Sequence, residues 1–235
     1  MRMPEKLALA VTGKGESPPP FRMIPAAWDH HRMDSPRLEW TNTTHDWTST
    51  VDHDHLADIR RDPARYSPGG ALHLLLEIMA YADDEAAYAG RHGVCTVTLH
   101  SDGSISVADD GRGTDTRLDE HGQPIRKPVM ATRDLRFFDD PPALALPDGA
   151  PRRGMSVVAA LSEWLVHTNR RRGGAWSQRY EHGVPVTDLV PVDDDGTTGT
   201  TVRFWPSPAA GSRPTAADVR RYAADYPHLD VLVVG

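Results

Sequence analysis

The sequence has only one cysteine, Cys95, among 235 residues, and it carries a formal net charge of −7. A disulfide within the chain is therefore excluded, and a cysteine in an alternating apolar run is typical of a small buried residue. An acidic chain is a poor candidate for a protein that grips nucleic acid by itself. We therefore expect no direct nucleic-acid partner.

Long apolar runs are also missing. No stretch approaches the roughly 20 residues that a membrane-spanning helix needs, and the short apolar stretch near the N-terminus ends in Gly and Pro instead of forming a signal peptide. We expect a cytoplasmic protein without a membrane partner. The hydrophobic content of 39% is enough for one domain with a sizeable core.

The first part of the chain differs from the rest. Residues 1–52 contain three consecutive prolines and no sustained hydrophobic period, so we interpret them as an N-terminal extension that is ordered only where it docks. Residues 53–235 form the predicted domain. His45, His53 and His55 alternate with aspartates near this boundary. They indicate either a metal site or a polar linker, and the lack of helical or hairpin spacing favours the linker.

Apolar spacing divides residues 53–235 into helices and strands. Residues 71–90 follow an amphipathic helical period that ends at Gly90, and alternating runs around Ser101–Gly103 predict a β-hairpin. Residues 114–150 are rich in Pro, Asp and Arg and are interpreted as an irregular lid. The other expected elements are a short helix within 55–66, a helix running into a strand over 155–169, three strands within 176–206, a helix over 215–227 and a closing strand at 231–235. Helices on one face of a mostly antiparallel sheet make an α+β, two-layer sandwich.

Three groups of residues that can carry chemistry follow one another in order. Glu77 lies on the long helix, Asp109-Asp110-Gly111-Arg112-Gly113 follows the second hairpin strand, and Thr198-Gly199-Thr200 precedes VRFWP. With the surrounding ALHLLLEIMAYADDEAAYAG, VTLHSDGSISVADDGRG and SVVAALSEWL, this order resembles the ATP-binding domain of the DNA gyrase B subunit, in the GHKL ATPase superfamily. The resemblance covers residues 53–235. It implies a mixed, mostly antiparallel sheet of the Bergerat (GHKL) type, without the transducer domain of that family.

The resemblance assigns roles to two carboxylates. Glu77 matches the general base that orients the water attacking the γ-phosphate, and Asp109 matches the acceptor of a hydrogen bond from the adenine amino group. A solvated helix glutamate and a turn aspartate are the alternatives. The apolar neighbours of Glu77 favour the catalytic role. Both carboxyl groups would then line one cavity, with Asp109 at the purine end and Glu77 at the triphosphate end.

Further nucleotide-binding positions implied by the resemblance are Gly111, Arg112, Gly113, Thr200, Glu85 and Arg171. The two glycines would let the backbone approach the nucleotide closely. Arg112 would pair with Glu85 at the pocket edge, and the alternative is an ordinary surface ion pair. Thr200 would hold the adenine through water, and the alternative is a plain strand residue.

Two departures from the family pattern fall on the catalytic helix. The resemblance puts a magnesium-binding asparagine four residues after Glu77, where this chain has Tyr81, and an aspartate where it has Ala80. Four residues make about one helical turn, so positions 77 and 81 face the same pocket. Magnesium prefers carboxylate, carbonyl or water oxygens to a phenol. Tyr81 therefore puts magnesium binding in question.

The phosphate loop departs as well. The matching stretch keeps Gly149 and Gly154, but Pro151 removes one backbone donor from the expected phosphate cradle. Arg152 and Arg153 either contact the phosphates directly or are solvated charges of the lid. The lid segment RDLRFFDD also lacks the family's Gly-Gly-Lys, and no transducer lysine is expected.

These residues favour a domain that still binds an adenine nucleotide, ATP or ADP, while its magnesium-dependent hydrolysis is impaired or absent. A weak but active GHKL ATPase is one alternative, and a nucleotide-free pseudoenzyme that contacts a gyrase-like partner is another. The family's N-terminal arm joins two subunits, so the extension suggests a protein partner or a homodimer. The sequence offers no DNA-cleavage domain, and we do not expect a complete topoisomerase.

Overall fold

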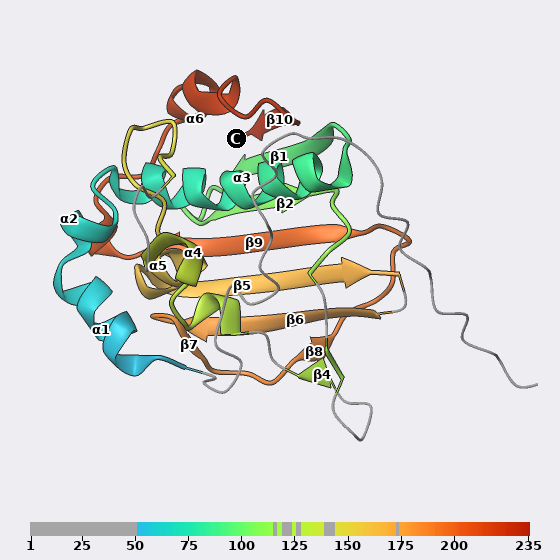
Figure 1. Cartoon of the computed structure of the whole chain (residues 1–235), viewed down its shortest axis with the longest axis horizontal. Helices are drawn as coiled ribbons and strands as arrows, with labels where there is room; N and C mark the ends of the chain where they lie inside the picture. Colours follow the sequence, from blue (N-terminus) through green and yellow to red (C-terminus); the bar gives the residue numbers. More distant parts are fainter. Residues whose placement is uncertain (1–50, 115–116, 119–123, 126–127, 139–143, 173) are drawn as a thin grey trace, which may run out of the picture. The chain divides into compact units, whose positions relative to one another are not determined.

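The computed structural model describes residues 51–235 except 115–116, 119–123, 126–127, 139–143 and 173 (Figure 1). These residues belong to one compact unit, Thr41–Gly235. Residues 1–50 of the predicted N-terminal extension lie outside the described residues. The extension and its boundary at residue 52 therefore stay predictions.

One mixed sheet forms the first layer of this unit (Figure 1). Its strands are β1 (Gly93–Leu99), β2 (Ile105–Asp109), β5 (Ser162–Arg171), β6 (Gly174–Glu181), β7 (Val184–Pro185), β8 (Val190–Pro191), β9 (Gly199–Pro206) and β10 (Leu229–Val234). The order is β10-β1-β2-β9-β5-β6-β7, and β8 also pairs with β6. β1 and β10 pair in parallel, and the other pairs of this sheet are antiparallel. The predicted lid contains a separate pair, β3 (Arg117–Leu118) and β4 (Pro124–Ile125).

Helices form the second layer, on one face of the sheet. They are α1 (His53–Arg61), α2 (Pro63–Tyr66), α3 (Gly70–Ala89), α4 (Leu135–Phe138), α5 (Met155–Ala160) and α6 (Ala216–Ala223), with the 3-10 turns η1 (Pro128–Met130) and η2 (Pro208–Ala210). α3 contacts β1, β2 and β10, whereas α5 contacts β5 and β6. The predicted α+β, two-layer sandwich is therefore confirmed.

Local chemistry explains where several of these elements begin and end. α3 stops at Gly90, whose φ of +64° is a left-handed conformation that favours glycine. The turn between β1 and β2 likewise places Gly103 at φ +92°. α6 begins with a capping box, because Thr215 and Asp218 each accept a hydrogen bond from the backbone N–H of the other.

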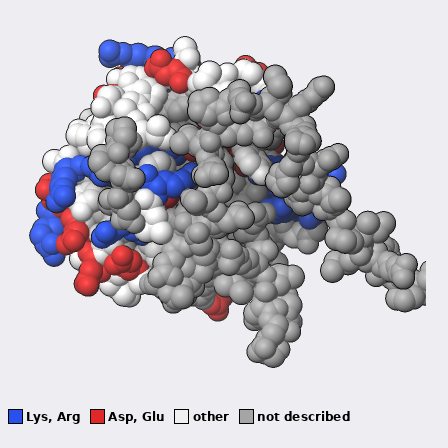
Figure 2. Space-filling model, viewed as in Figure 1, with Lys and Arg blue, Asp and Glu red and all other residues white. Residues whose placement is uncertain are grey.

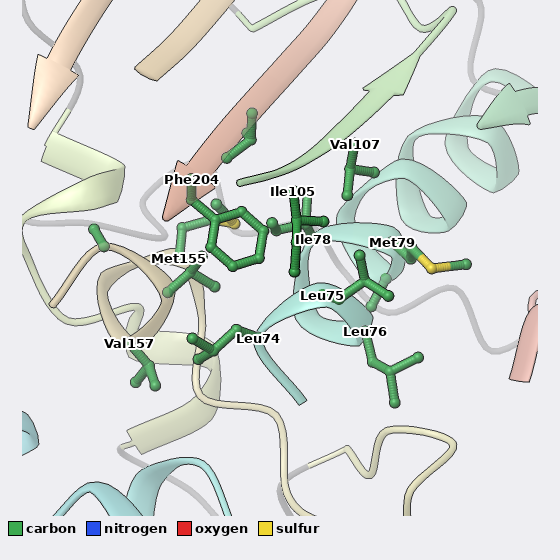
Figure 3. Packing of buried hydrophobic residues seen from close by; sticks show 14 of the residues in the cluster. Leu74, Leu75, Leu76, Ile78, Met79, Ile105, Val107, Met155, Val157 and Phe204 are labelled. Atoms are coloured by element: carbon green, nitrogen blue, oxygen red, sulfur yellow. The ribbon is translucent and has the colours of Figure 1, made fainter. Parts of the chain in front are cut away.

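The hydrophobic core lies between α3 and the sheet (Figure 3). Val97, Val107 and Val202 lie opposite one another on β1, β2 and β9, so they present one apolar row to the helices. Leu75 of α3 and Phe204 of β9 are fully buried in the same cluster. The alternation within the strands thus fixes which face of the sheet the helices cover.

α3 is more buried than an amphipathic helix. Leu74, Leu75 and Leu76 are all fully buried, although successive residues point to different sides of a helix. The chain around α6 provides the additional cover, since the hydroxyl of Tyr226 donates to the carbonyl of Leu76 at 2.8 Å. The predicted helix and its end at Gly90 are present, and its N-terminal half is buried on more than one side.

The His and Asp cluster at the start of the domain is not a linker. Asp52 caps α1 by accepting from the backbone N–H of His55 at 3.0 Å. His55 is buried, with Nε2 3.0 Å from Oγ of Ser156, and burial together with Arg133 lowers the pKa of His55 to about 4. Among the described residues no group of His, Cys, Asp and Glu is suited to a metal ion, and His45 lies outside them.

None of the described helices is both long enough and apolar enough to cross a membrane.

On the face shown in Figure 2, basic and acidic side chains intermingle around α1. The last turn of this helix carries Arg60 and Arg61, and Asp58 pairs with Arg61. This edge therefore mixes both signs of charge.

Replacing Leu75 with alanine should lower the free energy of unfolding by about 2–5 kcal/mol, because the change removes buried apolar surface and leaves a cavity. Replacing Leu232, which is 54% exposed, with alanine is the control and should change it by less than about 1 kcal/mol. Urea denaturation followed by circular dichroism measures both values. Equal losses would contradict this assignment of the core.

Candidate functional site

Asp109 forms one end of the candidate site, at the end of β2. Its place in the alternation of the strand puts it on the same face as Ile105 and Val107, which pack toward α3. Oδ1 of Asp109 accepts hydrogen bonds from the backbone N–H of Gly111 at 2.8 Å and of Thr200 at 3.3 Å. No hydrogen bond to Oδ2 is found among the described residues, so this oxygen remains available to a donor.

The surroundings of Asp109 also affect its charge. Burial raises the pKa of Asp109 to about 6, against the lowering effect of the two backbone donors. The next residue, Asp110, behaves differently: its exposed carboxylate binds Arg91 and the backbone N–H of Val94, and Arg91 lowers its pKa. The two adjacent aspartates therefore have separate tasks, and Asp110 secures the start of β1.

The glycines after Asp109 are required by close contacts within the protein. A Cβ on Gly111 would lie 2.7 Å from Oδ1 of Asp109 and 2.8 Å from Cγ of Glu85. Gly113 has φ +77°, and a Cβ there would lie 2.4 Å from the carbonyl oxygen of Arg170. The side chain of Asn169 on β5 fixes the next residue, because its Oδ1 accepts from the backbone N–H of Thr114 at 2.5 Å. The loop is thus held tightly against α3 and β5.

Arg112 and Glu85 form the ion pair that the resemblance implied. Nε of Arg112 lies 2.6 Å from Oε1 of Glu85 and Nη2 lies 3.0 Å from Oε2, which is a two-point contact. Arg171 lies near the same loop, since its Cγ would be 3.0 Å from a Cβ on Gly113. The structure therefore brings Arg112, Glu85, Arg171 and Asp109 to one end of the site.

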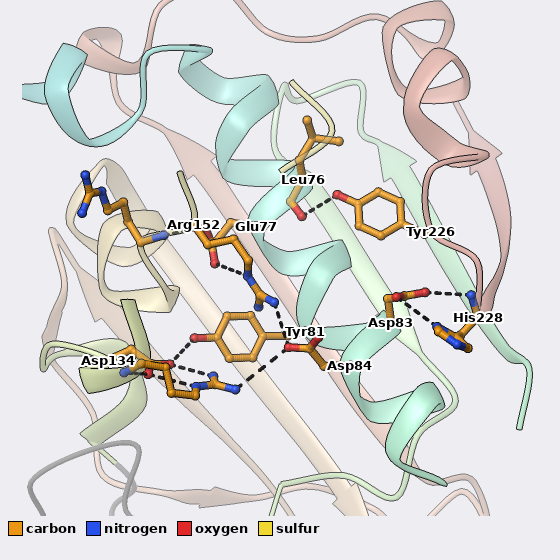
Figure 4. A network of polar contacts seen from close by, with 11 residues as sticks. Leu76, Glu77, Tyr81, Asp83, Asp84, Asp134, Arg152, Tyr226 and His228 are labelled. Atoms are coloured by element: carbon orange, nitrogen blue, oxygen red, sulfur yellow. Dashed lines mark hydrogen bonds and ion pairs between the residues drawn. The ribbon is translucent and has the colours of Figure 1, made fainter. Parts of the chain in front are cut away.

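Glu77 lies at the other end, two turns earlier on α3. Eight residues separate it from Glu85, which corresponds to roughly 12 Å along the helix. Glu77 is only 1% exposed, so it is not a solvated helix glutamate. Its Oε1 lies 3.4 Å from Nε of Arg152, and its Oε2 accepts from the backbone N–H of Arg153 at 3.0 Å (Figure 4). Both carboxylate oxygens are therefore bound to the loop that precedes α5.

Arg152 is buried next to Glu77. Its Nη1 donates to Oδ2 of Asp84 at 2.9 Å, while Nη2 is buried without a hydrogen-bond partner among the described residues. Its guanidinium lies over two aromatic rings, 5.0 Å from the centre of Tyr81 and 4.6 Å from that of Phe137. The alternative of a solvated lid charge is therefore wrong for Arg152.

Tyr81 extends this network to the predicted lid (Figure 4). Its hydroxyl donates to Oδ2 of Asp134 at 2.7 Å, and Arg136 binds the same carboxylate through Nε at 3.0 Å and Nη2 at 2.7 Å. Burial, followed by Asp134, raises the pKa of Tyr81 well above its usual range. Tyr81 is therefore a neutral donor. The RDLRFF stretch supplies the acid that receives this hydrogen bond.

The residues at this end do not fit a magnesium ion. Tyr81 stands at the position of the expected metal ligand, and its hydroxyl is committed to Asp134. Asp84 and Asp134 are both bound by arginines, which supply the positive charge that a metal would supply. A metal-binding set of three or more acidic, His or Cys residues is not found in the part of the chain that the structure describes.

The loop before α5 uses most of its backbone donors within the protein. The N–H groups of Gly149, Ala150, Arg152 and Arg153 donate to Leu146, Asp148, Leu144 and Glu77, and Pro151 has no N–H group. Gly149 and Gly154 adopt φ of +81° and +87°. The glycines thus support a closed turn, and four N–H groups of the loop are engaged within the protein instead of facing a phosphate in this conformation.

The sequence analysis missed several residues of the site. Asp84 lies seven residues after Glu77, so helical spacing could have indicated that it shares a face with Glu77. Asn169, Asp134 and Arg136 approach the site from distant segments. Tyr81 and Asp134 are 53 positions apart, and spacing carries no signal for such a contact.

Known proteins with similar sequences are DNA gyrase B subunits and a DNA topoisomerase 4 B subunit. The chain is 37% identical to the DNA gyrase B subunit of Haloferax volcanii over 164 residues, which is 64% of this chain and 25% of that protein. It is 36% identical to the gyrase B subunit of Thermotoga maritima over 159 residues, or 63% of this chain and 24% of the relative. The DNA topoisomerase 4 B subunit of Bacillus subtilis is 34% identical over 165 residues, or 68% and 25%. The matched region thus spans about a quarter of each relative.

A solved structure supports the same relationship. The topoisomerase IV ATP-binding domain of Francisella tularensis, in complex with a small-molecule inhibitor, superimposes with a TM-score of 0.55 and 29% identity, over 71% of this chain and 45% of that one. No family model matches the chain. Its homologues are therefore gyrase B and topoisomerase IV B subunits, and its described fold is similar to the GHKL ATP-binding domain of topoisomerase IV.

Replacing Arg152 with methionine should lower the free energy of unfolding by about 3–5 kcal/mol, because the change leaves Glu77 as a buried carboxylate without its cation. Arg61, whose side chain is 72% exposed and paired with Asp58, is the matched control, and its methionine variant should lose less than about 1 kcal/mol. Urea denaturation measures both. In a double-mutant cycle, Glu77→Gln should recover part of the loss. Similar losses for the two arginines would contradict the buried pair.

Proposed function

We propose that this chain, a homologue of the gyrase B and topoisomerase IV B subunits, binds an adenine nucleotide, ATP or ADP, and that its magnesium-dependent hydrolysis is impaired or absent. The geometry of Asp109 is the observation that carries the proposal. Its Oδ1 is held by two backbone N–H groups, and no hydrogen bond to Oδ2 is found among the described residues. A fixed acceptor of this kind selects a base that presents an amino group.

In the proposed site, helix α3 connects the purine end with the phosphate end. Glu85 contacts the Gly111 loop and Glu77 contacts the loop before α5, so the helix spans the two ends of the proposed site. A nucleotide lying along α3 would have its base near Asp109 and its phosphates near Arg152 and Arg153. Thr200 and Arg171 belong to the base end in this arrangement.

Three features support impaired hydrolysis. Glu77 is buried, and in this conformation both of its carboxylate oxygens are engaged by Arg152 and by the backbone of Arg153 instead of by a water. Tyr81 stands in the place of a metal ligand. The loop before α5 has used N–H groups that a phosphate cradle needs. Without a metal to neutralise the phosphates, transition-state stabilisation falls by several kcal/mol.

A nucleotide-free interaction module is the second candidate. The observation in its favour is the network of Glu77, Arg152 and Asp84, which pairs the buried guanidinium with two carboxylates without any ligand. In that case a gyrase-like partner, or a second copy of the chain through the N-terminal extension, would be the binding target. Nucleotide titration separates the candidates, because the module would bind no adenine nucleotide.

Replacing Asp109 with asparagine should weaken adenosine binding at least tenfold, measured by isothermal titration calorimetry. The two backbone donors hold the side-chain oxygen, so the new NH₂ group would face the adenine amino group, and two donors would meet. For the unmodified protein, affinity should fall as the pH drops below about 6, where Asp109 takes up a proton. The variant should lack this pH dependence. Adenosine is chosen because it has no phosphate to titrate.

Asp110→Asn is the matched control for this experiment. Its carboxylate binds Arg91 outside the proposed site, so adenosine affinity should stay within about twofold. An equal loss in both variants would point to general damage of the loop. If Asp109→Asn bound adenosine as tightly as the unmodified protein, this result would contradict adenine recognition by Asp109.

Phosphate release from ATP should be the same for the unmodified protein and for Glu77→Gln, with and without magnesium. The reason is that Glu77 is already bound to Arg152 and Arg153. A coupled phosphate assay under multiple-turnover conditions measures the rate. Release that needs magnesium and falls at least a hundredfold in Glu77→Gln would establish the active ATPase alternative instead.

A further inference from the structure

We propose that the guanidinium of Arg152 replaces the divalent cation at the phosphate end, so that this chain recognises a nucleoside diphosphate or triphosphate without a metal ion. The inference rests on the proposed nucleotide binding and adds the group that neutralises the phosphates. It predicts a site for a polyphosphate chain whose only cations belong to the protein.

The hydrogen bonds of Arg152 support this role. Nε and Nη1 are directed to Glu77 and Asp84, and Nη2 has no partner within the described residues. The residue is only 4% exposed, so water cannot readily satisfy that nitrogen. A buried donor without an acceptor is destabilising, whereas a phosphate oxygen would satisfy it with a charge-assisted hydrogen bond.

The place of Arg152 supports the same role. Its guanidinium lies 5.0 Å from the ring centre of Tyr81, the residue that occupies the expected position of the metal ligand. The cationic group is therefore next to the point at which a metal would neutralise phosphate charge. Arg136 also lies over the Tyr81 ring, at 5.4 Å, where it is paired with Asp134. An arginine remains charged at any physiological pH, so neither cation can be lost as a bound metal can.

Glu77 competes with phosphate for Arg152. In the described conformation its carboxylate lies 3.4 Å from Nε, which is longer than an ideal charge-assisted contact. A polyphosphate would share Arg152 with this carboxylate and would be repelled by its negative charge. Removing the charge of Glu77 should therefore strengthen phosphate binding, which is the opposite of the effect expected from damage to the site.

The experiment measures the affinities of ADP, adenosine and pyrophosphate by isothermal titration calorimetry, each with magnesium and with EDTA. The unmodified protein should bind ADP more tightly than adenosine, and EDTA should change the ADP affinity by less than about threefold. Arg152→Met should lose at least tenfold for ADP and pyrophosphate while adenosine affinity stays unchanged. Arg61→Met, an exposed arginine of α1, is the control and should behave like the unmodified protein.

Glu77→Gln keeps the proposal testable if Arg152→Met fails to fold. It should strengthen ADP binding about threefold or more in EDTA while adenosine binding stays unchanged. A weaker or unchanged ADP affinity in this variant would overturn the role of Arg152.

Other outcomes separate this inference from the proposed function. If magnesium raises the ADP affinity of the unmodified protein at least tenfold, the inference is wrong and nucleotide binding stands. If adenosine and ADP bind equally, the base end stands but the phosphate site does not exist. If neither binds, the proposed function fails and the inference fails with it.

Discussion

The guanidinium of Arg152 is held between Glu77 and Asp84 at a point where almost no water reaches it. Removing such charges from water is unfavourable, and only close pairing and hydrogen bonding offset that penalty. The Glu77 carboxylate also accepts a hydrogen bond from the backbone N–H of Arg153. One buried acid on α3 therefore fixes both the side chain and the backbone of the loop that precedes α5. The conformation of the phosphate end depends on this contact as well as on apolar packing.

The two ends of the candidate site differ in their unsatisfied groups. At the base end, the backbone N–H groups of Gly111 and Thr200 fix Oδ1 of Asp109, and no hydrogen bond to its Oδ2 is found in the described part of the chain. At the phosphate end, Glu77 and Asp84 bind Arg152, and the Nη2 donor of Arg152 has no hydrogen-bond partner among the described residues. A ligand that offers an amino group at one end and anionic oxygens at the other satisfies both. An adenine nucleotide has this arrangement, which unites the two proposals.

Much of the fold could be predicted from the sequence, because its signals are local. Alternation around Ser101–Gly103 predicted the β1–β2 hairpin, and Gly90 predicted the end of α3. The sequence motifs also predicted that Asp109, Gly111 and Thr200 lie together, and hydrogen bonds join them in the structure. Their binding of a base stays a prediction. The phosphate end could not be predicted in this way. Its contacts join α3 to segments more than 50 positions away, and the sequence did not indicate whether Arg152 is solvated or buried.

Tyr81 contacts several residues at the phosphate end, and these residues depend on one another through it. Its hydroxyl reaches Asp134 past a loop residue with no side chain, since a Cβ on Gly154 would lie only 3.2 Å from that oxygen. An asparagine is shorter than a tyrosine, so it would not make this hydrogen bond and would deprive the buried Asp134 of one donor. The rings of Tyr81 and Phe137 also hold the guanidinium of Arg152. The aromatic residue, the acid and the two arginines are therefore interdependent, and replacing Tyr81 with asparagine would not by itself create a metal site.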